Sequence, residues 1–501
     1  MEIVRIVQSS PPPKGIPFPT TIPSPQSVKD KIAIVGAGPA GIHMAYLLKK
    51  KGFQNVGVYE KTDRIGGKSL TVEHRNTIHE MGTCYTQPDY DENLIALAKE
   101  YGHWDPVELP SANVWSDKFP SPINYSSYII PEIMKIWKTS NKTVAQIALF
   151  KAMVQYCALH RNMFGKYEGE LMREPDQQTM ATLRCTFEDF LMKNKLLVLK
   201  PIFVASHTIL GYGHLDEISA LYGLMWNKPV HVKALADKFI GVSHGFNMIR
   251  GGFQNVWKTV VEKENINVIL NADILKVKRY SDYGYLDLQY RRRWHRKRIF
   301  FNFLIWTPSV YTTLRRLDAC RKEWNIFSKL KPAWFSTTLF SSTYGTRGYS
   351  PIDNWPDNVK NKREHSLWAQ RDSFGALNNY HGEDYKSGSL PGGPDGKFIR
   401  TGVAYQYGKR KPRSKYCLKK ILTKTLESTN ASNIQIIRQE SWEYFPKFSP
   451  DDMADGALWN IFKMQGSRST WFAGSSVNFE NVKSVLEYNK LLVSKMKDII
   501  A

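Results

Sequence analysis

The sequence VGAGPAG, residues 35–41, places three glycines in the pattern GxGxxG. A short apolar run, residues 32–35, ends at this stretch, and apolar residues recur at helical spacing over residues 42–48 behind it. In such a turn the first glycine permits a tight bend and the second lets a pyrophosphate approach the backbone. The third lets the helix pack closely on the strand. Residues 35–41 therefore predict a dinucleotide-binding turn in a protein of the α/β class.

A second predicted strand leads into Glu60 and completes a βαβ unit over residues 32–60. A carboxylate at this place accepts hydrogen bonds from ribose hydroxyls and repels a 2′-phosphate. The pyrophosphate would lie at the N-terminus of the helix, where free N–H groups and the helix dipole favour negative charge. The competing interpretation, glycines that only pack the backbone, does not account for strand, helix, strand and acid occurring in this order.

The residues that follow distinguish a flavin from a nicotinamide cofactor. Arg64 and the doublet Gly66-Gly67 in EKTDRIGGKS extend the phosphate-binding surface beyond the βαβ unit. This segment resembles the RxGGR/K motif of the flavin-containing amine oxidase family, with Lys68 where that family usually has arginine. The next stretch, IHEMGTCY, is similar to the family segment in which an acid and a glycine (Glu80 and Gly82) lead into backbone beside the flavin ring.

Two distant segments resemble the same family. MIRGGFQNVWKTVVEKENINVILNADILKVKR, residues 248–279, is similar to its glycine-rich helix start and adenine-side strand, with Ile274 as the backbone contact. STWFAGSSVNFENVKSVLEYNKLLV, residues 469–493, resembles the closing motif, in which a helix N-terminus points at the flavin ring and stabilises its reduced form. Asn481 and Val482 are the candidates for that contact, and Ser475 replaces the usual acid.

The resemblance implies FAD as the cofactor. The cofactor-binding residues that it implies are Gly36, Gly38, Pro39, Ala40, Gly41, Glu60, Lys61, Arg64, Gly66, Gly67, Lys68, Gly82, Thr83, Ile274, Gly474, Ser475, Asn481 and Val482. Within the superfamily, the segments ILGYGHLDEISALYGLMW (209–226) and SWEYFPKFSPDDMADGALWNIFKMQGSRSTWFAG (441–474) are most similar to the polyenoic fatty acid isomerase-like subgroup. Members of that subgroup use FAD to move double bonds in unsaturated fatty acids.

The expected architecture is a GxGxxG Rossmann-type FAD-binding domain with a discontinuous, inserted substrate domain. We expect the FAD-binding domain to comprise residues 30–105, 240–315 and 436–501. The substrate domain would comprise a helical piece, residues 106–239, and a piece of mixed strands, residues 316–435. Residues 1–29, rich in proline, would form a semi-extended leader.

The resemblance implies an FAD-dependent oxidoreductase or isomerase that transfers a hydride at flavin N5 on an unsaturated apolar substrate such as a polyunsaturated fatty acid. The alternatives are an amine oxidase that produces hydrogen peroxide and a flavin-binding scaffold without turnover. Flavin chemistry needs little from side chains, so no catalytic residue and no metal site are assigned. For Cys84 a covalent flavin link and an inert buried thiol both stay open.

A fatty acid would need an apolar tunnel and a cation for its carboxylate. Residues 129–226 carry enough Leu, Met, Phe and Trp to line a long apolar cavity that reaches the flavin ring. Tyr212, Tyr222, Met225 and Trp226 are the candidate substrate-pocket residues, with ordinary core packing as the alternative.

Composition restricts the partners. The 501 residues include 69 Lys plus Arg and 46 Asp plus Glu, for a net charge of +23. No zinc-finger spacing, RNP-like stretch or repeat indicates nucleic-acid binding. The basic runs at 291–298 and 407–416 predict either solvated loops or a peripheral membrane contact.

The sequence has no long apolar run, no signal-peptide core and five scattered cysteines. We expect a cytoplasmic protein, in which those loops can associate with a membrane.

Overall fold

The computed structural model describes residues 2–9, 11–74, 77–109, 112–241, 246–290, 295–344, 352–372, 375–376, 389–390 and 398–499. Of the predicted basic run at 291–298, residues 291–294 lie outside the described residues. Among the described helices, none is both long and apolar enough to cross a membrane.

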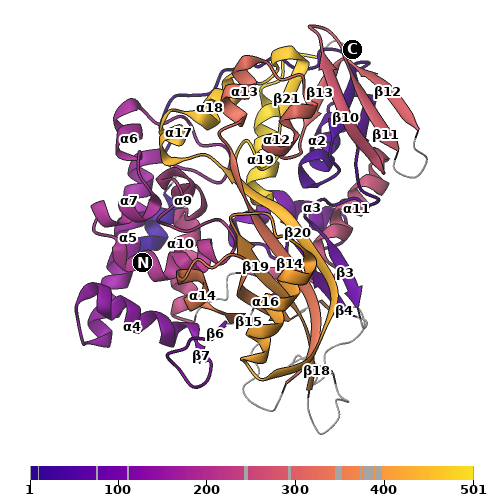
Figure 1. Ribbon diagram of the computed structural model, residues 1–501. Helices are drawn as coiled ribbons and strands as arrows, with labels where there is room; N and C mark the ends of the chain where they lie inside the picture. Colours follow the sequence, from indigo (N-terminus) through magenta and orange to yellow (C-terminus); the bar gives the residue numbers. More distant parts are fainter. Residues whose placement is uncertain are drawn as a thin grey trace.

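The core of the upper half in Figure 1 is a parallel sheet in the order β21-β13-β1-β2-β9. Its strands are β1 (Lys31–Val35), β2 (Asn55–Tyr59), β9 (Asn267–Ile269), β13 (Phe303–Trp306) and β21 (Thr470–Phe472). Nearly all side chains of β1 and β13 are buried, as expected for a sheet covered on both faces. The sheet thus joins three parts of the chain that are far apart in sequence, and it confirms the predicted α/β class.

Helix α2 (Pro39–Lys50) follows β1 directly and packs against α19 (Val482–Ser494) and α11 (Phe253–Lys263). Pro39 occupies the first helical turn, where its missing N–H costs nothing. A Cβ on Gly41 would lie 1.9 Å from the carbonyl oxygen of Gly36, so only glycine lets the helix approach the turn this closely. Asn489 of α19 donates to the Ala40 carbonyl at 2.8 Å and fixes the two helices together.

A large, mostly antiparallel sheet lies below, in the order β20-β14-β19-β16-β15-β6-β7, with β18 paired to β19 (Figure 1). Its strands are β6 (Asn113–Val114), β7 (Ile123–Asn124), β14 (Lys331–Tyr344), β15 (Ile352–Asn354), β16 (Ser366–Asp372), β18 (Ser389–Leu390), β19 (Phe398–Gly408) and β20 (Ala431–Lys447). The domain boundary predicted at residue 436 falls inside β20, which runs from this sheet toward the dinucleotide half.

A group of helices flanks the large sheet on the left of Figure 1. It comprises α4 (Tyr125–Trp137), α5 (Lys142–Phe164), α6 (Gln177–Thr182), α7 (Phe187–Lys193), α8 (Lys200–Phe203), α9 (Ala220–Trp226) and α10 (Pro229–Phe239). Side-chain caps fix several helix starts; Asn141, for example, accepts from the backbone N–H groups of Thr143 and Val144. Helix α9 is buried on all sides, which places it at the centre of this group.

Shorter elements complete the fold. The strands are β3 (Thr71–His74), β4 (Thr77–Glu80), β5 (Pro106–Glu108), β8 (Asn247–Ile249), β10 (Ala272–Arg279), β11 (Gly284–Tyr290), β12 (Arg296–Phe301) and β17 (Gly375–Ala376). The helices are α1 (Glu2–Gln8), α3 (Ala96–Glu100), α12 (Val310–Thr313), α13 (Arg321–Phe327), α14 (Pro356–Lys360), α16 (Lys415–Glu427), α17 (Pro450–Ala454) and α18 (Ala457–Lys463).

The proline-rich leader begins with helix α1, and its described residues 11–30 contain no further helix or strand. Backbone hydrogen bonds hold it to both halves of the protein. Ile16 N–H donates to the Glu174 carbonyl, and Ile22 N–H donates to the Lys495 carbonyl, each at 2.8 Å.

Candidate active site

Two glycine turns face each other at the carboxyl end of β1. Gly36 has φ +99°, and a Cβ on Gly38 would lie 3.6 Å from the Cα of Gly67. Gly66 N–H donates to the Ala37 carbonyl at 2.8 Å and holds the second turn against the first. The result is a cradle of bare backbone in front of the N-terminus of α2, the arrangement that accommodates a pyrophosphate.

Glu60 and Arg64 supply opposite charges beside this cradle. The buried Glu60 carboxylate accepts from Ala37 N–H at 2.9 Å and from Thr62 N–H at 2.8 Å, so its orientation is fixed. Arg64 Nη2 donates to the Gly67 carbonyl at 2.7 Å, whereas its buried Nη1 has no hydrogen-bond partner among the described residues. A buried guanidinium nitrogen without an acceptor fits a site built for an anionic ligand.

The N-terminus of α19 reaches the same place. Asn481 caps the helix by accepting from Ser484 N–H at 2.7 Å, and Asn481 and Val482 both line the cavity described below. Gly474 has φ +84°, and a Cβ there would lie 2.8 Å from the Thr307 carbonyl, which lets the chain pass close to β13. The start of this helix, with the positive end of its dipole, therefore provides a second anion-stabilising wall.

Ile274 of β10 lies on the opposite side of the cradle and is buried. Arg316 Nη1 donates to its carbonyl at 2.7 Å and to the Asp273 carboxylate at 2.6 Å. The Ile274 carbonyl thus already accepts one hydrogen bond, which fixes the backbone at this point of β10.

One continuous cavity of about 1180 Å³ connects the cradle with the helical group. The predicted cofactor-binding residues that line it are Gly36, Gly38, Pro39, Ala40, Glu60, Lys61, Arg64, Gly67, Lys68, Gly82, Thr83, Ile274, Gly474, Ser475, Asn481 and Val482. Gly41 and Gly66 instead pack behind the two turns. Tyr212 and Trp226 line the cavity, whereas Tyr222 and Met225 lie in the core beside it.

Aromatic rings stack along the far wall. Tyr212 and Tyr444 have ring centroids 5.9 Å apart and planes at 14°. Phe335 continues the row, at 5.1 Å from Tyr444 and 5.7 Å from Tyr405. All four side chains line the cavity, so a row of aromatic rings borders it on this side.

A polar cluster interrupts this surface at Arg371, a buried residue of β16. Its Nε donates to the Tyr405 hydroxyl at 2.6 Å, and its Nη2 donates to the Glu80 carbonyl at 2.5 Å. Burial disfavours the charged guanidinium, but the neighbouring polar groups outweigh burial and raise the pKa of Arg371, so it carries its charge. Burial also raises the pKa of the adjacent Cys84 thiol, which favours the protonated, unreactive form.

Glu80 is fully buried behind the cradle. Its Oε1 accepts from Phe253 N–H at 2.8 Å and from the Thr71 hydroxyl at 3.0 Å, but no described residue contacts its buried Oε2 through a hydrogen bond. Burial raises the pKa of this carboxyl to about 7.

Glu80 is expected to make the protein less stable as the pH rises from about 4.5 to 7, because the folded state holds a proton that the unfolded state has released. For this group alone, the shift in pKa corresponds to a loss of about 2–3 kcal/mol over that window. Unfolding in urea at several pH values, compared between the wild type and Glu80→Gln, isolates this contribution. Identical pH profiles for the two proteins would contradict a buried, protonated Glu80.

Comparisons with known proteins agree with this geometry. Residues 34–101 match the NAD(P)-binding Rossmann-like domain. The polyenoic fatty acid isomerase of Ptilota filicina is 26% identical over 276 residues, which are 50% of this chain and 51% of the isomerase. The chain spans about half or less of the length of the curated relatives that it matches.

Two solved structures resemble the whole fold. The CLA-producing fatty acid isomerase from P. acnes has a TM-score of 0.74 at 20% identity, covering 93% of this chain and 99% of that one. A putrescine oxidase variant has a TM-score of 0.59 at 15% identity, covering 93% and 98%. The chain has the fold of the flavin-containing amine oxidases. Together with the Rossmann-like domain, these relatives indicate that it binds FAD.

The residues of this amine-oxidase fold fit a flavin dinucleotide. The glycine cradle, the unpartnered Arg64 nitrogen and the start of α19 would hold the pyrophosphate and the flavin end, while Glu60 and the strand at Ile274 would hold the ribose and adenine. Among the described residues, no group of three or more His, Cys, Asp or Glu is placed to bind a metal ion.

Sequence reasoning missed the part of the site that comes from the large sheet. Phe335 (β14), Arg371 (β16) and Tyr405 (β19) line the cavity, as do Lys238 and Phe239 at the end of α10. These strands mix apolar and polar residues without a regular alternation, and nothing local marks the positions that face a ligand.

Proposed function

We propose that the protein is an FAD-dependent oxidoreductase that isomerises a double bond in an unsaturated fatty acid. When bound, the flavin would accept a hydride from the substrate and return it at another carbon. The chain's own residues would hold the substrate, orient it and exclude water.

The single observation that supports this proposal is the continuity of the cavity. A volume of about 1180 Å³ exceeds the roughly 300–1,000 Å³ of an ordinary ligand pocket and leaves room for a second molecule beside the cofactor. Beyond the cradle the walls are largely apolar, with Ile129, Ile202, Ile209, Leu210 and Leu235 among the lining residues. A long hydrocarbon chain fits such a space. A substrate that fills the cavity also excludes water from it.

The stacked rings argue against an amine oxidase. A substrate held between two parallel rings needs about 7–8 Å between them, because each face requires 3.5–4 Å of contact distance. Tyr212 and Tyr444 are 5.9 Å apart and contact each other, so they form one continuous wall without a slot. This arrangement favours a substrate that lies along the rings.

Lys238 is the cation best placed for the substrate carboxylate. It lines the cavity next to Phe239, with its Nζ 5.7 Å from the centre of the Phe246 ring. Burial lowers the pKa of this ammonium, although the charge of Glu108 partly restores it. A carboxylate bound there would replace the hydration that the ammonium group loses on burial.

The test is anaerobic mixing of the purified protein with polyunsaturated fatty acids and, separately, with amines. We expect the fatty acid to be converted to a product with shifted double bonds. We also expect the flavin to stay oxidised at steady state in this anaerobic mixture. In a parallel mixture exposed to air, we expect no hydrogen peroxide to form. Peroxide formation from amines together with inert fatty acids would contradict the proposal and favour an amine oxidase.

Lys238→Met is expected to raise KM for the free fatty acid about 10- to 100-fold and to leave kcat within about threefold, since a charge-assisted hydrogen bond contributes about 1.5–3 kcal/mol. The methyl ester of the same acid is the control substrate, because it lacks the charge. If the variant loses the same factor on acid and ester, Lys238 does not bind the carboxylate.

A further inference from the structure

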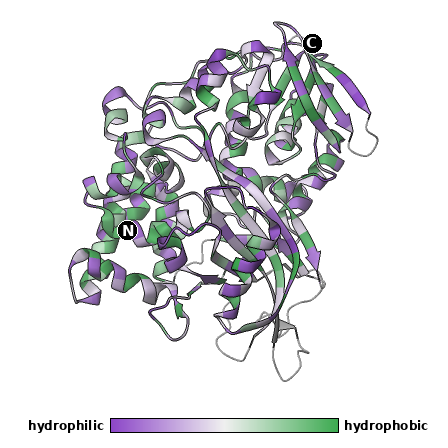
Figure 2. Ribbon diagram, viewed as in Figure 1, coloured by the Kyte–Doolittle hydropathy of each residue, from purple (hydrophilic) through white to green (hydrophobic). Residues whose placement is uncertain are grey.

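The hairpin of α4 and α5 carries an unusual surface at its turn. Trp137, Val144 and Ile147 are 49%, 40% and 50% exposed, although each is apolar. Lys135, Lys138 and Lys142 are exposed among them. We call these six residues the α4–α5 tip. Figure 2 shows hydrophobic and hydrophilic residues side by side along this hairpin, at the lower left of the view.

The charge around the tip has one sign. The sequence from residue 133 to residue 167 contains no aspartate or glutamate, whereas it contains four lysines between residues 135 and 151. The nearest acid of α4, Glu132, is paired with Lys118 at 3.1 Å. An exposed apolar surface with lysines among its residues is complementary to anionic headgroups lying over hydrocarbon, and a nucleic acid would leave the exposed Trp and Ile side chains without apolar partners.

The tip is connected to the cavity by the helix on which it lies. Asn124 and Ser126, at the start of α4, are both exposed and both line the cavity, so the cavity reaches the surface there. Residues 126 and 137 are about 17 Å apart along the helix. The end of α10 packs beside α5 through Phe150 and Phe239, with ring centroids 5.9 Å apart, and Phe239 lines the cavity as well.

We propose that the α4–α5 tip docks the protein on the surface of an anionic phospholipid bilayer, with Trp137 and Ile147 entering the headgroup region and the lysines contacting lipid phosphates. In this orientation the cavity opens close to the bilayer, from which an unsaturated acyl chain can enter. The entry step depends on the proposed function, but the docking itself does not. This surface is distinct from the basic segments at 291–298 and 407–416.

The experiment is sedimentation of the full-length protein with vesicles of phosphatidylcholine containing phosphatidylserine, and with phosphatidylcholine alone. We expect binding to the anionic vesicles that weakens with salt, and little binding to the neutral ones. The triple variant Lys135→Glu, Lys138→Glu, Lys142→Glu is expected to bind at least about 100-fold more weakly. Trp137→Ser with Ile147→Ser is expected to lose roughly tenfold or more.

The matched control is Arg413→Glu, Lys415→Glu, Lys419→Glu, which makes the same change of charge at exposed positions in and just after the basic segment at 407–416. It should bind like the wild type. Equal losses of binding in both triple variants would show attraction by net charge alone. Unimpaired binding of the tip variants would place the membrane contact elsewhere. Either result overturns the proposal, and so does a wild-type protein that does not bind. Sedimentation requires no substrate, so a failure here is distinguishable from a failure of the isomerase proposal.

Discussion

Gly38→Val protein is expected to fold normally and to purify without flavin. A Cβ at residue 38 would lie 3.6 Å from the Gly67 Cα, an ordinary contact distance, and Gly38 does not require a positive φ. The Cβ itself is therefore compatible with the fold. The two methyl groups of valine, however, would project into the gap between the two glycine turns, where the pyrophosphate must approach the backbone.

The measurement is the flavin absorbance of the purified protein, followed by titration with FAD. We expect no absorbance and an affinity at least about 100-fold weaker, because overpacking of this kind costs about 1–3 kcal/mol and contacts to the pyrophosphate are lost as well. Gly38→Ala is the control, and its single methyl group should cause a smaller loss. Full flavin occupancy of the valine variant, with an unchanged circular dichroism spectrum, would mean that the cofactor binds elsewhere.

The dinucleotide half could be predicted from the sequence because its signals are local. Residues 32–60 carry a buried strand, a glycine turn, a helix and an acid in consecutive order, and each glycine has one steric reason to be there. Gly41 illustrates this, since its contact with Gly36 is set within a single turn. The parallel pairing of β1 with β2 then follows from the βαβ unit, in which the helix lies between two neighbouring strands.

The substrate half was less predictable because its site is assembled by long-range pairing. Phe335 and Tyr405 come together only because β14 and β19 pair, and β16 then places Arg371 beside Tyr405. Helix α9 shows the opposite difficulty. It is buried all round, so the sequence could not show that Trp226 at its end faces the cavity while Tyr222 and Met225 face the core. Tyr222 instead accepts a hydrogen bond from Phe448 N–H.

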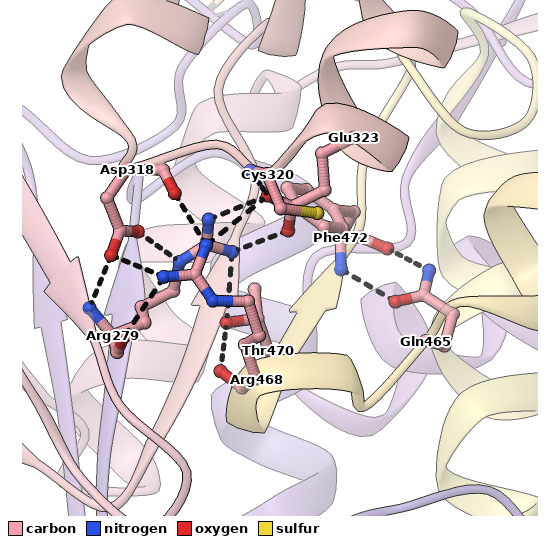
Figure 3. A network of polar contacts seen from close by, with 8 residues as sticks. All are labelled: Arg279, Asp318, Cys320, Glu323, Gln465, Arg468, Thr470 and Phe472. Carbon is pink, nitrogen blue, oxygen red and sulfur yellow. Dashed lines mark hydrogen bonds and ion pairs between the residues drawn. The ribbon is translucent and has the colours of Figure 1, made fainter.

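The largest loss of stability is expected from Arg279→Met. Arg279 lies at the end of β10, with its side chain fully buried, at the centre of the network in Figure 3. It donates to Asp318 at 2.8 Å and to both oxygens of Glu323 at 2.8 and 2.9 Å. Arg468 also donates to Asp318, at 2.6 Å. The network thereby ties β10 to α13 and to the turn before β21.

Removing Arg279 takes away the two-pronged partner of the buried Glu323 and leaves it only the longer ion pair with Arg468, at 3.8 Å. A broken buried pair costs about 3–5 kcal/mol in free energy of unfolding. Urea unfolding measures this loss. Arg298→Met is the matched control, because Arg298 makes the same two-pronged contact with Asp287 at 2.8 and 3.1 Å but is 51% exposed, and an exposed pair contributes about 0–1 kcal/mol. The double variant Arg279→Met, Glu323→Met should regain part of the loss, since it removes the buried carboxylate that has lost its closest partner. Equal effects of Arg279→Met and Arg298→Met would show that burial does not govern the strength of these ion pairs.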